Sequence, residues 1–259
     1  MTDLRPDLAP MHGENLGALA GIPEAGTGTT VPGLTADLAR ASLALARRFA
    51  AGGTLWCASP ASSPHAHHIA VEFVHPVIMG KRALPAVVVR PDTDLVASLR
   101  ATVRPGDMVV AVAGADDAEV VEAMRRSPAW GVETVWLGAG ARPADGAADH
   151  VLWLDTDDPL VASEQFVRAY HLLWELTHVC FEHTGLLTAP QVCEEEVCIT
   201  CSDEGRVAEI ISVDELGEAL VRTAEGREHI DVSLIDPPRP NDLVLVHAGS
   251  AIASLEDRP

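Results

Sequence analysis

Short apolar runs alternate with helical stretches over most of the chain, and this alternation limits the possible folds more than any other feature. The runs expected to form buried strands are residues 54–58, 85–89, 108–113, 132–138 and 150–155. The stretches expected to form helices are residues 35–51, 63–75, 94–102, 117–127 and 159–182. Strands that alternate with helices predict a parallel sheet covered on both faces, which is a three-layer α/β fold. Ligands of such sheets bind at the carboxyl ends of the strands, here the loops 58–63 and 114–117.

The hydrophobic period changes to two near the C-terminus. Gly and Pro within residues 183–190 break the last long helix, which indicates a domain boundary. Beyond this break, short strands are expected at residues 206–211, 218–223, 229–235 and 242–247. In the third of them, Ile230, Val232 and Leu234 alternate with polar residues, as in a half-buried strand. Four or five short strands in a segment of about 60 residues predict a small OB-like β-barrel.

These two patterns divide the 259 residues into four parts. Residues 1–34 are expected to form an irregular N-terminal arm, and residues 35–183 the α/β domain. Residues 184–196 are expected to form a linker, and residues 197–259 the β-barrel domain. The length of the chain suits two ordinary domains.

The charge balance excludes several classes of partner. The chain has 18 Lys and Arg against 38 Asp and Glu, which gives a formal net charge of −20. Binding to nucleic acid or to an anionic membrane surface needs an excess of Lys and Arg, so neither is expected. The N-terminal residues lack the basic and apolar regions of a signal peptide, and no apolar run reaches about 18 residues. We therefore expect a cytoplasmic protein.

The five cysteines fall into two groups. Cys57 and Cys180 lie in apolar segments and are expected to be inert core thiols. Cys193, Cys198 and Cys201 lie in a polar stretch, where thiolate or metal chemistry is expected in a reducing compartment. A CxxC spacing lets two sulfurs converge on one ion, and thiolates suit a soft iron that carries strong π-acceptor ligands. A structural zinc half-site or a redox pair are the alternatives.

A second group of possible ligands lies on the helix expected at 63–75. His68 and Glu72 are spaced i,i+4 and face the same way, with His65 and His75 close to the same stripe. Three imidazole or carboxylate ligands can hold Zn²⁺ with one open position. The alternative is a histidine-rich helix face buried at a dimer contact.

Residues 35–183 resemble a sugar isomerase (SIS) domain of the phosphoheptose isomerase type. The resemblance rests on the segments GGTLWCASPASSPHAHHIAVEF, RPGDMVVAVAGADDAEVVEAM and ADHVLWL…HLLWELTH. It implies a sugar-phosphate loop at Ser59, Ser62 and Ser63, a homodimer, and metal ligands at His68, Glu72 and His171, with Ser163 where the family has Gln. The second loop of the family is rich in Ser and Thr, whereas this chain has Asp116 and Asp117 there. Because these like charges disfavour a phosphate, we predict a degenerate site and a chain that is not an enzyme.

Residues 197–255 resemble the HypC/HupF family of [NiFe]-hydrogenase maturation chaperones. The residues that carry the resemblance are an opening Cys-Ile, the segments RVAEI and DVSLID, and the closing NDLVLVHAGSAIASLE. The resemblance implies that Cys198 and His247 bind the iron fragment or a partner, and that Cys201 and Cys193 are further candidate ligands. Family members begin Met-Cys, whereas Cys198 is internal and ThrCysSerAspGlu replaces the usual IleProGly.

Together these observations predict a hydrogenase maturation chaperone. It would handle the iron fragment as a transient Fe(CN)2CO cargo and dock on a HypD-like maturation protein or on the large-subunit precursor. One alternative is a metal-dependent sugar-phosphate isomerase or a sugar-phosphate sensor. Another is an interaction module stabilised by zinc at Cys193, Cys198 and Cys201.

Overall fold

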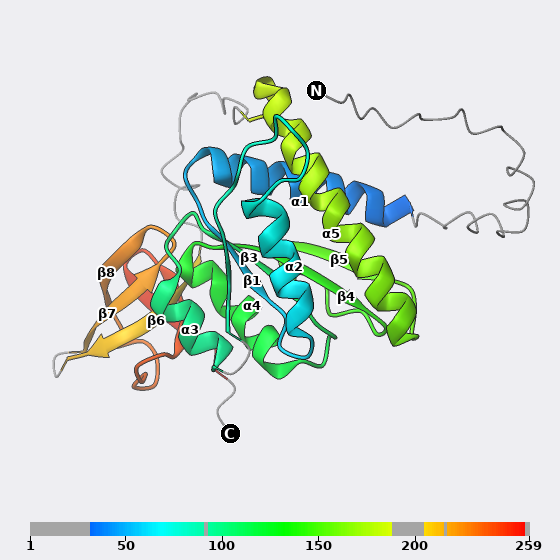
Figure 1. Cartoon of the computed structure of the whole chain (residues 1–259). Helices are drawn as coiled ribbons and strands as arrows, with labels where there is room; N and C mark the ends of the chain where they lie inside the picture. Colours follow the sequence, from blue (N-terminus) through cyan, green and yellow to red (C-terminus); the bar gives the residue numbers. More distant parts are fainter. Residues whose placement is uncertain (1–31, 91–92, 188–204, 215–216, 257–259) are drawn as a thin grey trace, which may run out of the picture.

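The structure is a computed structural model that describes residues 32–90, 93–187, 205–214 and 217–256. Two folded domains follow one another along these residues (Figure 1). The first is an α/β domain with a five-stranded sheet, and the second is a closed five-stranded β-barrel. Both fold predictions from the sequence are therefore confirmed.

The sheet of the first domain has the strand order β2-β1-β3-β4-β5, and every neighbouring pair is parallel. The strands are β1 (Leu55–Ala58), β2 (Ala86–Val88), β3 (Met108–Val112), β4 (Glu133–Ala139) and β5 (His150–Leu154). The helices are α1 (Pro32–Ala50), α2 (Ser63–Val74), α3 (Leu95–Thr102), α4 (Ala118–Trp130) and α5 (Pro159–Glu182). A short 3-10 turn, η2 (Thr184–Leu186), follows α5.

Apolar side chains fill both faces of the sheet. All five residues of β3 are buried, and successive side chains point to opposite faces. Met108 and Val110 pack with α1, α2 and α5, whereas Val109 and Ala111 pack with α3 and α4. A parallel strand covered on both faces is apolar throughout for this reason. Residues of β1 and β3 lie side by side, so the loops that follow these two strands meet at one edge of the sheet.

Aspartate side chains fix where three of the helices begin. Asp94, Asp117 and Asp158 each accept a hydrogen bond from the first turn of α3, α4 and α5, respectively. Such caps satisfy backbone N–H groups that have no partner inside the helix. Helix α4 ends at Gly131, whose φ of 68° is the left-handed conformation that glycine adopts without strain.

The barrel has the strand order β10-β8-β7-β6-β9. Its strands are β6 (Arg206–Val213), β7 (Glu218–Thr223), β8 (Gly226–Asp231), β9 (Leu243–His247) and β10 (Ser250–Ser254). It closes where Ser250 of β10 pairs with Asp231 of β8. Its core is a cluster of small and branched apolar side chains that includes Ala208, Ile210, Val221, Ile230 and Val246.

Two expectations for the barrel need correction. The third strand was expected to continue to residue 235, but β8 ends at Asp231 and the Leu234 side chain is 69% exposed. The strand ends there because the Asp231 carboxylate accepts a hydrogen bond from the Ser233 amide at 2.7 Å, which turns the backbone. The last strand, β10, was not expected from the sequence.

Helices α3 and α4 lie between the sheet and the barrel (Figure 1). A buried carboxylate, Glu209 of β6, joins the two domains. It accepts hydrogen bonds from Arg100 Nε at 3.0 Å, Arg126 Nη1 at 2.9 Å and Trp130 Nε1 at 3.0 Å. The barrel backbone also approaches closely at Gly131, where a Cβ would lie 2.9 Å from the Ala224 carbonyl oxygen.

None of the helices in the described part of the chain is long and apolar enough to cross a membrane.

Candidate functional site

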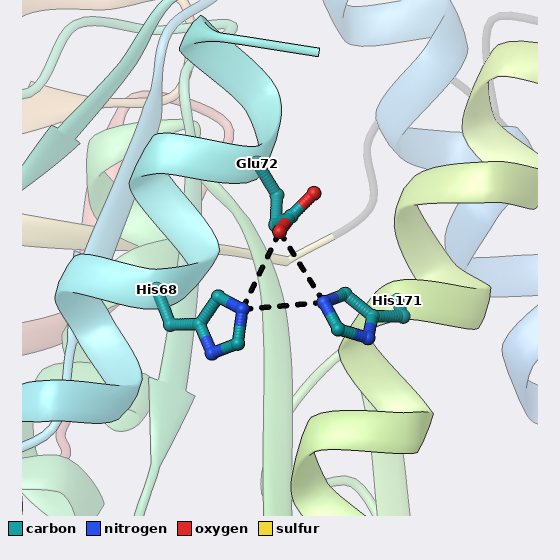
Figure 2. A group of neighbouring side chains, drawn as sticks. All are labelled: His68, Glu72 and His171. Carbon is teal, nitrogen blue, oxygen red and sulfur yellow. Dashed lines mark hydrogen bonds and ion pairs between the residues drawn. The ribbon is translucent and has the colours of Figure 1, made fainter. Parts of the chain in front are cut away.

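Three potential metal ligands converge between α2 and α5. His68 and Glu72 lie one turn apart on α2, and His171 lies opposite them on α5 (Figure 2). The pair on α2 faces α5 because the other side of α2 carries Ile69, Ala70 and Phe73, which are buried in the core. The spacing predicted from the sequence therefore places the His and Glu on one face, and the packing of α5 brings the second imidazole to them.

The distances within this group suit a tetrahedral cation. His68 Nε2 and His171 Nε2 each lie 3.3 Å from Glu72 Oε1, and the two nitrogens are 3.2 Å apart. Ligands about 2.0 Å from a tetrahedral zinc are about 3.3 Å from one another. The three donors therefore fit three corners of a tetrahedron, which leaves a fourth corner for a water molecule or a substrate.

Tyr170 holds the ring of His68 in this orientation. The hydroxyl of Tyr170 and Nδ1 of His68 are 2.7 Å apart, which leaves Nε2 of the same ring facing the other two ligands. Burial, with a contribution from the Glu72 carboxylate, raises the pKa of Tyr170 to about 12, so its hydroxyl stays protonated. A histidine that binds a metal through Nε2 donates its Nδ1–H to such a partner, which fixes its tautomer and orientation. No feature of the sequence distinguished this tyrosine from other core residues of α5.

His65 and Ser163 lie next to the group but do not belong to it. His65 Nε2 and Ser163 Oγ are 3.3 Å apart, and they join the first turns of α2 and α5. Burial, together with the neighbouring His68, lowers the pKa of His65, which favours the neutral form of its imidazole. Ser163, at the position of the expected Gln, thus contacts His65 instead of the three converging ligands. Glu164 pairs with Arg168 on the exposed face of α5.

A cleft of about 520 Å³ lies at the carboxyl ends of the strands, beside the first turns of α2 and α5. Its lining includes Ser59 and Ser62 of the first loop and Gly114 of the second. Ser59 is buried, and its hydroxyl donates to the Val112 carbonyl at 3.1 Å. Ser63, the first residue of α2, is not among the lining residues. His65 also lines this strand-end cleft and lies one turn before His68 on α2.

The acidic side chains of the cleft are not the ones expected from the sequence. Neither Asp116 nor Asp117 is among its lining residues. The Asp117 carboxylate turns back to accept a hydrogen bond from Val120 N at 3.1 Å. Asp157 and Asp158 line it instead. They follow β5, so their position after a parallel strand was the signal that could have identified them.

The structure describes two of the five cysteines, Cys57 and Cys180. Cys57 and Cys180 are buried, and burial raises the pKa of both thiols, which makes them poor nucleophiles and ligands. Cys193, Cys198 and Cys201 lie outside the described residues.

His247 lies at the end of β9 and is exposed. Strand β6 begins at Arg206, which pairs with Val246 of β9, so the chain enters the barrel beside His247.

A second cavity of about 620 Å³ lies between the domains. Its lining includes Met124, Trp136, Val207 and Leu243, and Arg125 is the one charged residue among the described residues that line it. Arg125 is paired with Glu122 and Glu256. This cavity is therefore an apolar space of the domain interface.

Comparison with known proteins assigns the two halves separately. Residues 205–258 match the model of the HupF/HypC family. The N-terminal half is similar to two proteins named phosphoheptose isomerase. The one from Nitratidesulfovibrio vulgaris is 29% identical over 50% of this chain and 70% of its own length. The one from a Roseiflexus species is 28% identical over 48% of this chain and 72% of its own length.

A solved structure, the phosphoheptose isomerase from Francisella tularensis, is 17% identical to this chain. It covers 58% of this chain and 88% of its own chain, with a TM-score of 0.49. The family model confirms the HypC/HupF resemblance, and the curated relatives confirm the phosphoheptose isomerase resemblance.

The prediction that the chain is not an enzyme is contradicted. The relatives that match its N-terminal half are named as isomerases, which are enzymes. The prediction relied on Asp116 and Asp117 filling the ligand site, whereas the structure places both outside the lining of the cleft.

Proposed function

We propose that the chain acts in [NiFe]-hydrogenase maturation through its barrel and carries a metal-dependent isomerase site in its α/β domain. The observation that carries the first part is the HupF/HypC match, which covers the whole barrel from Arg206 to Ser254. Proteins of this family work with hydrogenase maturation partners. The partner surface proposed here is the edge of the barrel where the chain enters β6 beside His247.

At this edge, Cys198 would hold the iron fragment while the barrel docks on a HypD-like protein or on the large-subunit precursor. Thiolates favour a soft iron with strong π-acceptor ligands, and a site with few protein ligands can release its cargo. Cys201, Cys193 and His247 are the candidate additional ligands. Such thiolates persist in a reducing compartment, which supports a cytoplasmic location.

Complementation tests this role. A host that lacks the gene and expresses Cys198→Ala should show no hydrogenase activity, whereas Thr200→Ala, a change in the same segment, should restore it. Cys201→Ala decides between one thiolate and two. Normal hydrogenase activity with Cys198→Ala, at a protein level equal to that of the wild type, would contradict the proposal.

The second part rests on the triangle formed by His68, Glu72 and His171. When bound there, a divalent ion supplies Lewis-acid polarisation of a substrate oxygen. Tyr170 orients His68, and both imidazoles contact Oε1 of Glu72. We assign proton transfer between adjacent substrate carbons to the other oxygen of the same carboxylate. An aldose–ketose interconversion requires this transfer from C2 to C1 together with movement of the hydroxyl proton from O2 to O1.

Metal content and proton exchange test this part together. The purified wild-type protein should contain about one zinc or other divalent ion per chain, because three ligands and an open position form a catalytic type of site. It should also exchange the C2 proton of an aldose in deuterated water. His171→Ala should lose both the ion and the exchange. His67→Ala is the matched control, since His67 is an exposed histidine of the same helix that contacts Ser63 O.

A homodimer through the α/β domain is the third element of the proposal. Large apolar side chains are exposed near the ends of α2 and on α5, among them Val77, Met79 and Leu172. We propose that these side chains contribute to the dimer contact, because exposed apolar groups favour association. Sedimentation of the whole chain tests this, with Met79→Asp expected to yield monomers and Leu234→Asp, a change in the barrel, expected to leave the dimer intact.

A further inference from the structure

A small pocket at the interface of the two domains is lined by three arginines. Arg104 comes from the turn between α3 and β3, and Arg222 and Arg227 come from β7 and β8 of the barrel. The volume of this arginine pocket is about 200 Å³, the space that roughly six or seven water molecules occupy in the liquid. In a chain with a formal net charge of −20, such a concentration of positive charge is unexpected.

The two arginines of the barrel lie directly opposite each other. Arg222 and Arg227 are register partners in the antiparallel pair of β7 and β8, so their side chains leave the sheet on the same face. Like charges in such positions destabilise a sheet. Arg222 is half-buried, and its Nη1 donates to the Arg100 carbonyl at 2.8 Å, which directs its guanidinium toward the α/β domain. Arg104 adds a third positive charge from that domain.

Among the described residues, no carboxylate pairs with any of these three guanidinium groups. Glu209 lies opposite Arg222 in the register, but its carboxylate is bound by the side-chain donors of α3 and α4. The Asp107 carboxylate accepts from three N–H groups, one of them the backbone amide of Arg104. The acidic residues of the β7–β8 hairpin pair with Arg206 instead. The positive charge of the pocket is therefore available to a ligand.

The rest of the lining narrows the class of ligand. Val103, Pro105 and Trp130 supply apolar surface, which suits an anion with a short carbon skeleton. Guanidinium groups bind carboxylates and phosphates through paired N–H donors. The net charge of the chain repels an acidic macromolecule, whereas a small anion in the pocket interacts mainly with the nearby arginines, because salt screens charges beyond about 8–10 Å. A small molecule is therefore favoured over an acidic polypeptide.

We propose that the arginine pocket binds a small organic dianion, either a dicarboxylate or a phosphate monoester. The ligand would bridge Arg104 of the α/β domain to Arg222 and Arg227 of the barrel, and so join the two domains. This proposal needs neither the metal ligands of α2 and α5 nor the cysteine segment, so its outcome is separate from that of the proposed function.

Calorimetric titration and thermal unfolding of the full chain test the proposal. Succinate represents the dicarboxylates and glycerol 3-phosphate the phosphate monoesters, with succinamide and glycerol as their uncharged counterparts at the same ionic strength. At least one dianion should bind at least about tenfold more tightly than its counterpart and raise the melting temperature saturably. The dianion that binds identifies the acidic group that the pocket selects. Absence of saturable binding by both dianions overturns the proposal.

Two variants locate the binding. Arg104→Gln with Arg227→Gln removes two charges and keeps Arg222, whose hydrogen bond to α3 supports the domain interface. The affinity for the dianion should fall at least about tenfold. Arg40→Gln removes an exposed arginine of α1, which covers the other face of the sheet, and should leave the affinity unchanged. An unchanged affinity in the double variant would place the ligand elsewhere and overturn the proposal.

Arg227→Glu gives a readout without any ligand. It replaces the like-charge pair of Arg222 and Arg227 by an opposite-charge pair, so the melting temperature of the free protein should rise by about 1–3 °C. The further rise caused by the dianion should disappear. A lower melting temperature in this variant would show that Arg227 already has a counter-charge in the free protein, which contradicts the proposal.

Discussion

Two polar clusters of this protein differ in whether the hydrogen-bond acceptors are matched by donors from the chain itself. In the first, Glu209 meets the N–H donors of Arg100, Arg126 and Trp130, and its side chain is only 3% exposed. In the second, His68, Glu72 and His171 direct three potential acceptor atoms toward one another, and the His171 side chain is 44% exposed. Donors and acceptors match in the first cluster. The second has no such match, and a cation at its centre would complete it.

This difference teaches which buried polar groups to expect at a functional site. A carboxylate that is surrounded by guanidinium and indole N–H groups needs no ligand, so its role is to hold two domains together. Acceptors that converge within hydrogen-bond distance repel one another unless a proton or a metal ion lies between them. The second pattern therefore indicates chemistry, although both clusters are built around a glutamate carboxylate.

Removing the carboxylate of the first cluster should have the largest effect. Glu209→Ala removes the carboxylate that accepts from Arg126 Nη1 and Trp130 Nε1 at the domain interface, while the ion pairs of Arg126 with Glu122 and Glu256 remain. We expect the free energy of unfolding to fall by about 3–5 kcal/mol, because the buried donors of this cluster lose the carboxylate that they share. Urea titration followed by tryptophan fluorescence would measure the loss, since Trp130 lies in the cluster.

The control for this change is Glu225→Ala. Glu225 pairs with Arg206 at 3.4 Å, but its side chain is 80% exposed. Surface pairs of this kind contribute about 1 kcal/mol or less. An equal loss in the free energy of unfolding for both variants would contradict a stabilising role of the Glu209 cluster at the domain interface.

Adding a cation to the second cluster should have the next largest effect. Zinc at about 100 times its dissociation constant should raise the free energy of unfolding by about 2.7 kcal/mol. His68→Ala should abolish this stabilisation, and His67→Ala should retain it. Thermal unfolding with and without a chelator would measure both. Stabilisation that survived in His68→Ala and disappeared in Cys198→Ala would assign the ion to the cysteine segment instead.

The sequence predicted most of the fold because the signals involved are local. The spacing of apolar residues and the positions of Gly and Pro predicted the five parallel strands and the helices between them. They also predicted the change to a barrel. The end of β8 was missed because it depends on the Asp231 side chain accepting from the Ser233 amide, a detail that alternation does not encode. Strand β10 was missed because its short run, SAIAS, carries a weak apolar pattern.

The sites were harder to predict because their members come from distant segments. His68 and Glu72 were visible as an i,i+4 pair, whereas His171 is 99 residues from Glu72 and was named through resemblance alone. Tyr170 contacts His68 only because of how α5 packs on α2, which the sequence of α5 alone does not show. Glu209 would be taken for an outward polar residue of a barrel strand, since the alternation within β6 does not show that α3 and α4 cover that face.

The smallest effect concerns Glu133, which combines features of both clusters. Its Oε1 lies 3.1 Å from His150 Nε2, and its Oε2 accepts from Arg48 Nη2 at 2.9 Å. The hydrogen bond with His150, together with Arg48, holds the pKa of Glu133 below its ordinary value. The unfolded chain therefore binds more protons than the folded one as the pH falls. The stabilising contribution is present above the ordinary pKa of about 4.5 and is lost below it.

Glu133→Gln should therefore cost about 1 kcal/mol or less at neutral pH, because the pair is partly exposed to solvent. The difference between wild type and variant should shrink as the pH falls toward and below 4.5, the ordinary value for a glutamate. Urea titrations at a series of pH values would measure it, with Glu164→Gln, from an exposed pair on α5, as the control. A difference that stayed constant with pH would show that Glu133 acts through packing. It would then resemble neither cluster, because its charge would contribute nothing.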